Sequence, residues 1–296
     1  MTTTAEKSGQ YTLGDRSVHR IGYGAMQLSG PHVMGPPADR AAAVAVLRRA
    51  VELGVDHIDT SDYYGPYVTN EIIREALHPY PEHLTIVTKI GARRTPEGEW
   101  PEALGADELR QAVHDNLDHL GVDALAVVNL RMPGFAEPVQ RSLAEPMETL
   151  AELQQQGLVQ HIGISNVTPQ MFAEARGIAP VVCVQNHYNL VHRQDDALVD
   201  ALAREGVAYV PFFPLGGFSP IQSAALETVA RRLEATPMEI ALAWLLARSP
   251  NLLLIPGTRS VAHLEENLQA AARVLGPVEL EELDRIGGDG TLDPDL

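Results

Sequence analysis

The sequence of 296 residues holds a single cysteine, Cys183, which excludes an internal disulfide and a zinc site built from cysteine ligands. Basic residues are also few, with 22 lysines and arginines against 39 acidic residues and a formal net charge of −17. This balance argues against nucleic acid or an anionic membrane as a partner. No window holds the roughly eighteen consecutive apolar residues of a membrane-spanning helix, and the N-terminus lacks a signal-peptide pattern. We expect a cytoplasmic protein that acts on a small molecule.

Short apolar runs alternate with helical segments along the whole chain. We predict strands at 20–26, 55–59, 84–90, 124–130, 159–165, 181–187, 207–212 and 251–257. We predict helices near 39–53, 69–77, 107–120, 141–156, 168–177, 195–205, 222–247 and 260–275, with the segment 222–247 divided near Thr236-Pro237. Strands that are each followed by a helix are typical of parallel βαβ units.

The two kinds of connection differ in length and composition. Helix-to-strand joints are short and place a glycine after the helix, as in ELGVD at 52–56 and HLGVD at 119–123. Strand-to-helix joints are longer and more varied, as in LSGPHVMGPPAD at 28–39. This asymmetry favours a (β/α)8 TIM barrel, an α/β fold whose site is built by the loops after the strands. A doubly wound sheet is the alternative, but no GxGxxG sequence links a strand to a helix.

We therefore expect one barrel domain over 1–296. The segment YTLGDRSVHRIGYG at 11–24 is predicted to contain a short N-terminal β-hairpin that turns at Gly14-Asp15 and caps the bottom of the barrel. Residues 1–10 and 287–296 are expected to be flexible tails.

Polar side chains end several predicted strands, where a barrel places its reactive groups. Asp59 and Lys89 end neighbouring strands and should pair, because neither charge can remain buried alone; such a pair could also be purely structural. Tyr64 favours a chemical role, since a nearby ammonium would lower the pKa of its phenol and Asp59 would keep that ammonium charged. The three together would form a general acid that protonates a carbonyl oxygen as hydride reaches its carbon.

These motifs resemble the aldo-keto reductase family. HIDTSDYYG at 57–65 is similar to the family signature, with a tyrosine five residues after an aspartate, and VTKI at 87–90 supplies the lysine. Further matches are LAELQQQGLVQHIGISN at 150–166, VQNHYN at 184–189, and IPGTR and HLEEN within 255–267. The resemblance covers nearly the whole chain. It implies a (β/α)8 barrel and an NADP(H)-dependent oxidoreductase that reduces an aldehyde or ketone to an alcohol.

The resemblance also implies roles for single residues. Tyr64 would donate the proton, tuned by Asp59 and Lys89, whereas Tyr63 would only pack. The cofactor-binding residues would be Ser165, Asn166, Gln185, Phe212, Leu215, Gly257, Thr258, Arg259, His263, Glu266 and Asn267. Residues that could contact the substrate are Met26, Trp100, Arg131, Phe135 and Phe218.

The segment IPGTRSVAHLEEN at 255–267 is predicted to hold the cofactor phosphate. Thr258 or Ser260 could cap the following helix, whose free N–H groups favour an anion. Arg259 adds a charged fork suited to phosphate. The family frequently has lysine at the position of Gly257 and arginine at that of His263, so two charges are missing here. The remaining matches still favour NADPH over NADH.

Most family members end the fourth strand in a histidine that orients the substrate carbonyl. In ALAVVNLRM at 124–132 we place Asn129 at that position, as in the β-subunits of voltage-gated potassium channels, which makes the chain an Asn-for-His variant. An asparagine keeps an N–H donor but cannot carry charge. Arg131 could pair with an acidic side chain or face the site.

Two alternatives stay open at this point. Asn129 could mark an NADP(H)-binding regulatory or sensor subunit with slow turnover, although the set of Asp59, Tyr64 and Lys89 favours an enzyme. A phosphate-binding barrel isomerase or aldolase would use Lys89 as a Schiff-base amine. That function leaves the spacing of Tyr64 unexplained.

Overall fold

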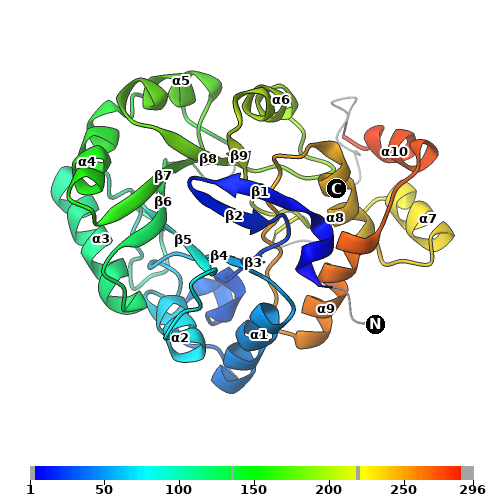
Figure 1. The fold of residues 1–296 in the computed structure, drawn as a ribbon, viewed down its shortest axis with the longest axis horizontal. Coiled ribbons are helices and arrows are strands. Elements are labelled where there is room, and N and C mark those ends of the chain that lie inside the picture. The colour runs from blue at the N-terminus through cyan, green and yellow to red at the C-terminus, as the bar shows by residue number, and fades with distance from the viewer. Residues whose placement is uncertain (1–3, 135–136, 218–220, 288–296) are drawn as a thin grey trace.

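The computed structural model describes residues 4–134, 137–217 and 221–287. Parallel strands form one curled sheet in the order β3-β4-β5-β6-β7-β8-β9 (Figure 1). Parallel bridges Tyr209–Leu252 and Ile21–Leu254 join both edges of this sheet to the segment 252–254, so the predicted eighth strand is reduced to bridges that close the barrel. The strands are β3 Tyr23–Gly24, β4 His57–Asp59, β5 Thr85–Ile90, β6 Leu125–Arg131, β7 Val159–Ser165, β8 Val181–Gln185 and β9 Ala208–Tyr209.

Helices surround this sheet in the order of the sequence (Figure 1). The α-helices are α1 Arg40–Glu52, α2 Val68–Leu77, α3 Ala106–Leu120, α4 Ala144–Gln155, α5 Pro169–Ile178, α6 Asp196–Glu205, α7 Ala224–Arg232, α8 Pro237–Arg248, α9 Val261–Gln269 and α10 Pro277–Asp284. Short 3-10 helices are η1 Ala5–Ser8, η2 Met26–Leu28, η3 Pro31–Val33 and η4 Ala270–Ala272. The predicted break within 222–247 is confirmed, because Thr236 caps α8 and Pro237 occupies its first turn. Helix α10 was not predicted.

The N-terminal hairpin is confirmed and plugs the barrel. Strands β1 Gln10–Leu13 and β2 Arg16–His19 are antiparallel, and Figure 1 shows them lying across the centre of the strands. Leu13 and Val18 are buried in the interior cluster that includes Val127 of β6. The expected flexible tail over 1–10 is wrong from Ala5 onward, because η1 begins at Ala5, which is fully buried. Residues 1–3 and 288–296 lie outside the described residues.

A glycine lets two polar side chains share the interior of the barrel. Asn129 Oδ1 accepts a hydrogen bond from Cys183 Sγ at 3.3 Å, and both residues are fully buried. Gly163 faces them from β7. A Cβ at this position would lie 2.0 Å from Asn129 Oδ1 and 2.5 Å from Cys183 Sγ.

We therefore expect Gly163→Ala to lower the free energy of unfolding by about 1–3 kcal/mol, as overpacking of a filled interior does. Urea unfolding followed by circular dichroism measures this change. Gly177→Ala in α5 is the control: nothing lies within 4 Å of its added Cβ, and alanine should favour the helix by about 0.5–1 kcal/mol. Equal stability of Gly163→Ala and the wild type would mean that Asn129 does not fill this space.

Candidate active site

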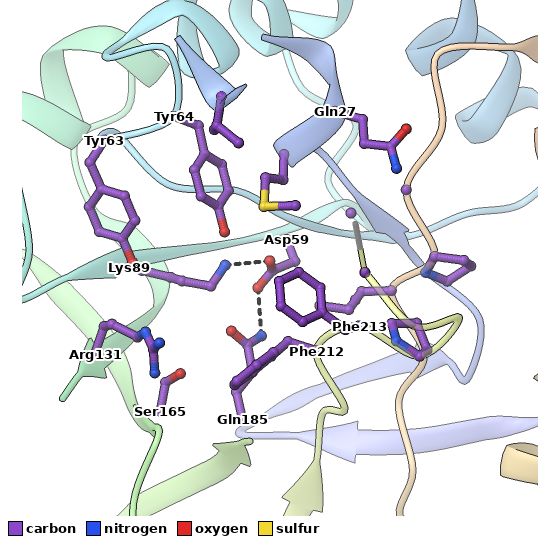
Figure 2. Close-up of a pocket in the computed structure, with 18 of the residues that line it drawn as sticks. Gln27, Asp59, Tyr63, Tyr64, Lys89, Arg131, Ser165, Gln185, Phe212 and Phe213 are labelled. Atoms are coloured by element: carbon purple, nitrogen blue, oxygen red, sulfur yellow. Dashed lines mark hydrogen bonds and ion pairs between the residues drawn. The ribbon is translucent and has the colours of Figure 1, made fainter. Parts of the chain in front are cut away.

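A cavity of about 1020 Å³ opens where the strands of the barrel end. Five strands, β4 to β8, each contribute a polar side chain from one of their last two positions. In order these residues are Asp59, Lys89, Arg131, Ser165 and Gln185. Figure 2 shows their side chains converging from neighbouring strands. The asymmetry of the loops therefore predicted the correct end of the barrel.

Asp59 is held by two partners at once. Lys89 Nζ donates to Asp59 Oδ1 and, at 3.0 Å, to the carbonyl oxygen of Thr60. Gln185 Nε2 donates to the second carboxylate oxygen, Oδ2, at 2.8 Å. Asp59 and Lys89 are each 4% exposed. The predicted ion pair is present, and the amide of Gln185 fixes the carboxylate on its other side.

Two tyrosines line the cavity beside this pair. The ring centroid of Tyr64 lies 5.3 Å from Lys89 Nζ, and Figure 2 shows the hydroxyls of Tyr63 and Tyr64 both pointing toward Lys89. Their rings meet edge to face at 5.5 Å, and Trp100 packs against both. Tyr63 was expected only to pack. It forms part of the cavity wall instead, because the turn after β4 presents both neighbours to the same side.

The pKa of Tyr64 is raised, not lowered as predicted from the nearby ammonium. Burial of the phenol is the main cause, and the charge of Asp59 adds to it. The positive charge of Arg131 opposes both effects. The phenol of Tyr64 therefore keeps its proton over the physiological pH range.

Asn129 does not reach the cavity, so its predicted place at the rim is wrong. Alternate residues of β6 point into the barrel: Val127 joins the interior cluster, Asn129 bonds Cys183, and Arg131 lines the cavity. Asn129 thus lies one layer below the position assigned to it. The alternation of the strand could not separate residue 129 from residue 131, because both face inward and only the depth of the cavity distinguishes them.

Arg131 occupies the rim position instead. Its Cζ lies 5.3 Å from the ring centroid of Phe212, and its Nη2 donates to the carbonyl oxygen of Gly134 at 2.9 Å. Arg131 pairs in register with Ser165 of β7. Burial lowers the pKa of Arg131 from its ordinary value, yet an arginine stays charged in proteins.

Most of the predicted cofactor-binding residues surround the same cavity. Those that line it are Ser165, Gln185, Phe212, Leu215, Gly257, His263, Glu266 and Asn267. Three do not line it. Asn166 lies behind, where its Nδ2 donates to the carbonyl oxygen of Pro133 at 2.6 Å; Thr258 is buried and Arg259 is exposed.

Three buried oxygen atoms test whether a nicotinamide fits. Ser165 Oγ, Asn166 Oδ1 and Gln185 Oε1 make no hydrogen bond with any residue that the structure describes. A buried polar atom without a partner is costly. A primary carboxamide carries both donors and an acceptor, so it can satisfy the Ser165 and Gln185 oxygens from within the cavity. Phe212 provides an aromatic face there, and its own ring is stacked on His187 at 5.5 Å.

At the other end of the cavity, two glycines allow the backbone at Gly24 to pack closely against the segment 255–257. A Cβ on Gly24 would lie 2.5 Å from the carbonyl oxygen of Ile255, and one on Gly257 would lie 2.6 Å from that of Gly24. Helix α9 begins beside them, and Ser260 caps it by accepting from the backbone N–H of His263 at 3.4 Å. Of the two predicted caps, Ser260 is therefore the one used.

Some of the residues predicted to contact the substrate line the cavity. Met26 and Trp100 line the cavity as predicted, whereas Phe135 and Phe218 lie outside the described residues. The structure adds further cavity-lining residues. Most of them lie in the long strand-to-helix connections, and the length of these connections could have pointed to them. One lies at the start of α8, where no feature of the sequence indicated it. The added residues include Gln27, His32, Val33, Glu102, Phe213 and Met238.

Two negative findings apply to the part of the chain that is described. Within 4–134, 137–217 and 221–287, no group of three or more histidine, cysteine, aspartate or glutamate side chains could hold a metal ion. In the same ranges, no helix combines the length and apolar character needed to cross a membrane.

Comparison with known sequences identifies relatives over most of the chain. The model of the aldo/keto reductase family matches residues 20–220 and 221–287. Pyridoxine 4-dehydrogenase of Escherichia coli (strain K12) is 62% identical over 281 residues, which cover 94% of this chain and 98% of that protein. An uncharacterized oxidoreductase of Schizosaccharomyces pombe is 37% identical over 284 residues, 96% of this chain and 91% of the relative.

Solved structures show the same barrel. A thermostable aldo-keto reductase crystallised with the inhibitor epalrestat superposes with a TM-score of 0.80 at 31% identity, covering 94% of this chain and 99% of that one. An aldo-keto reductase from Klebsiella pneumoniae in complex with NADPH gives a TM-score of 0.79 at 23% identity, covering 97% and 96%. At that identity, the second comparison supports the fold alone.

Proposed function

Because the chain belongs to the aldo/keto reductase family, we propose that it reduces the 4-formyl group of pyridoxal with NADPH and catalyses the reverse oxidation of pyridoxine with NADP+. The observation that carries this proposal is the convergence of Asp59, Lys89 and Tyr64 at one cavity in a chain that is 62% identical to pyridoxine 4-dehydrogenase. The sensor alternative was suggested by Asn129, which bonds Cys183 and does not line the cavity, so the set of Asp59, Lys89 and Tyr64 supports the enzyme instead.

The residues that would hold NADP(H) follow from the orphaned oxygens and from the residues that line the other end of the cavity. Ser165 and Gln185 would bind the carboxamide, and Phe212 would stack on the nicotinamide ring. The bound cofactor would supply the hydride. Gly24 and Gly257, which line the cavity, would lie beside the diphosphate, while the start of α9 would face the 2′-phosphate.

Tyr64 would give its proton to the carbonyl oxygen. Burial raises the pKa of this phenol, so the protonated form needed for reduction is present at neutral pH. The reverse oxidation needs the phenolate, which the same burial disfavours. As hydride arrives, negative charge develops on the substrate oxygen near Lys89 and Arg131, whose charges would stabilise it.

The direct test is an assay of pyridoxal with NADPH, followed at the nicotinamide absorbance, with benzaldehyde as a second aldehyde. We expect turnover of pyridoxal at a higher kcat/KM than benzaldehyde. A wild-type enzyme that turns over benzaldehyde but not pyridoxal would keep the reductase and refute this substrate. Failure with every carbonyl in the presence of bound NADPH would refute the proposed reaction.

Preference for NADPH should depend on Arg259. This side chain is exposed and directly precedes Ser260, the N-cap of α9. We expect Arg259→Ala to weaken NADPH binding by about tenfold, the value of one hydrogen bond between charged groups, and to leave NADH binding within twofold. Fluorescence titration of both cofactors measures this. Arg285→Ala, an exposed arginine in an ion pair beyond α10, is the control. An equal weakening of NADH binding would mean that Arg259 stabilises the helix and does not contact the 2′-phosphate.

A further inference from the structure

A buried cation stands beside the reacting centre of the cavity. Arg131 ends β6, and its Cζ lies 5.3 Å from the ring of Phe212, where the nicotinamide is proposed to stack. Lys89 forms an ion pair with Asp59, and Arg131 brings a second positive charge to the wall of the same cavity. The position therefore favours an electron-rich group on the substrate.

The aromatic side chains that line the cavity indicate which kind of substrate would carry the electron-rich group. Tyr63, Tyr64 and Trp100 are in mutual edge-to-face contact on one side, and Phe212 lies on another. Such walls suit a flat ring. A guanidinium presents several N–H donors in one plane and is suited to two neighbouring oxygens. An aromatic aldehyde with an ionised hydroxyl on the adjacent ring carbon offers two such oxygens.

Among the residues that the structure describes, three carboxylates line the cavity: Asp59, Glu102 and Glu266. Glu102 accepts from Arg141 Nη1 at 2.7 Å, so its charge is paired. Asp59 is occupied by Lys89 and Gln185. Glu266 belongs to α9, at the end proposed for the adenosine phosphate.

We propose that Arg131 is a specificity-determining residue, which selects aldehydes that carry an oxyanion on the ring carbon next to the formyl group. This inference rests on the proposed function, because pyridoxal has its 3-oxygen in this relation to its 4-formyl group. Arg131 binds the 3-oxyanion and the carbonyl oxygen together. It thereby turns the formyl group toward the hydride side of the cavity, and it also polarises the carbonyl.

The test compares matched substrates that differ only in the oxyanion. Pyridoxal is paired with its 3-O-methyl ether, and salicylaldehyde is paired with 2-methoxybenzaldehyde. In the wild-type enzyme with NADPH we expect kcat/KM to favour the hydroxyl member of each pair by about 10- to 100-fold, the range for hydrogen bonds to charged groups. In Arg131→Met we expect this ratio to fall to within threefold of one. Arg131→Lys, which keeps the charge but loses the fork, should give an intermediate ratio.

The control is Arg94→Met. The Arg94 guanidinium lies 3.8 Å from the ring centroid of Trp100, so it also places a positive charge near the site, but it does not line the cavity. The hydroxyl-to-methoxy ratio should be unchanged in this variant. Binding of 4-deoxypyridoxine to the complex with NADP+, measured by calorimetry, provides a readout besides turnover. It should weaken at least tenfold in Arg131→Met only.

The outcomes separate the two proposals. No hydroxyl preference in the wild-type enzyme overturns the role of Arg131, whether or not any variant folds. So does a preference that survives in Arg131→Met or that is lost equally in Arg94→Met. If pyridoxal is not reduced at all, the proposed substrate fails, while the salicylaldehyde pair still decides whether Arg131 selects an oxyanion.

Discussion

Tyr64→Phe should lower kcat/KM for pyridoxal by about a thousandfold while leaving the Kd of NADPH within twofold. The loss reflects removal of the general acid, which contributes roughly 10²- to 10⁴-fold. Cofactor binding should survive because Tyr64 is proposed to act on the substrate carbonyl, across the cavity from Ser165 and Gln185. Stopped-flow reduction under single-turnover conditions, together with cofactor fluorescence, measures both quantities.

Tyr63→Phe is the matched control, because the two phenols are neighbours in sequence and meet at 5.5 Å. Both hydroxyls point toward Lys89 in Figure 2. We expect Tyr63→Phe to retain at least a tenth of the wild-type rate. The opposite pattern, a large loss in Tyr63→Phe and a small one in Tyr64→Phe, would transfer the proton-donor role to Tyr63.

Lys89→Met should be costly in stability as well as in activity. Asp59 and Lys89 form a buried pair, each 4% exposed, and removing one partner leaves a buried charge uncompensated. The expected loss is about 3–5 kcal/mol in the free energy of unfolding. Reduction of pyridoxal should fall below detection, because the ammonium beside Tyr64 is gone. Urea unfolding and the NADPH assay measure the two effects.

The chain offers a close control, since Lys7 is its one other lysine and is exposed. Lys7→Met should change stability by less than about 0.5 kcal/mol. The double variant Lys89→Met/Asp59→Leu should regain much of the lost stability without regaining activity, because it removes both buried charges. If Lys89→Met alone is as stable as the wild type, the pair is more hydrated than its burial indicates.

The barrel could be predicted because its signals are local and repeated. Each apolar run, each glycine after a helix and each longer loop after a strand follows from the chemistry of a few neighbouring residues. Helix α10 escaped prediction although Gly276 and Pro277 mark its start. The eighth strand shortened to bridges because barrel closure depends on tertiary contacts at Leu252 and Leu254.

The site was predictable as a set of strand ends but not in depth or electrostatics. Lys89, Ser165 and Gln185 lie where their strand positions suggested. The choice of Asn129 over Arg131 was wrong, since inward alternation along β6 is the same for both. The direction of the pKa of Tyr64 was wrong for a related reason. A nearby charge can be inferred from sequence, whereas the extent of burial that outweighs it cannot.

The two oxygens of Asp59 impose a limit on how this enzyme can be redesigned. One oxygen binds Lys89 beside the proposed proton donor, and the other binds Gln185 beside the proposed nicotinamide. The machinery for the proton and that for the hydride therefore share a single carboxylate and cannot be altered independently. Cofactor preference should be adjustable at the distant start of α9, around Arg259. Substitutions at Gln185 should instead change the nicotinamide contact and the acid together.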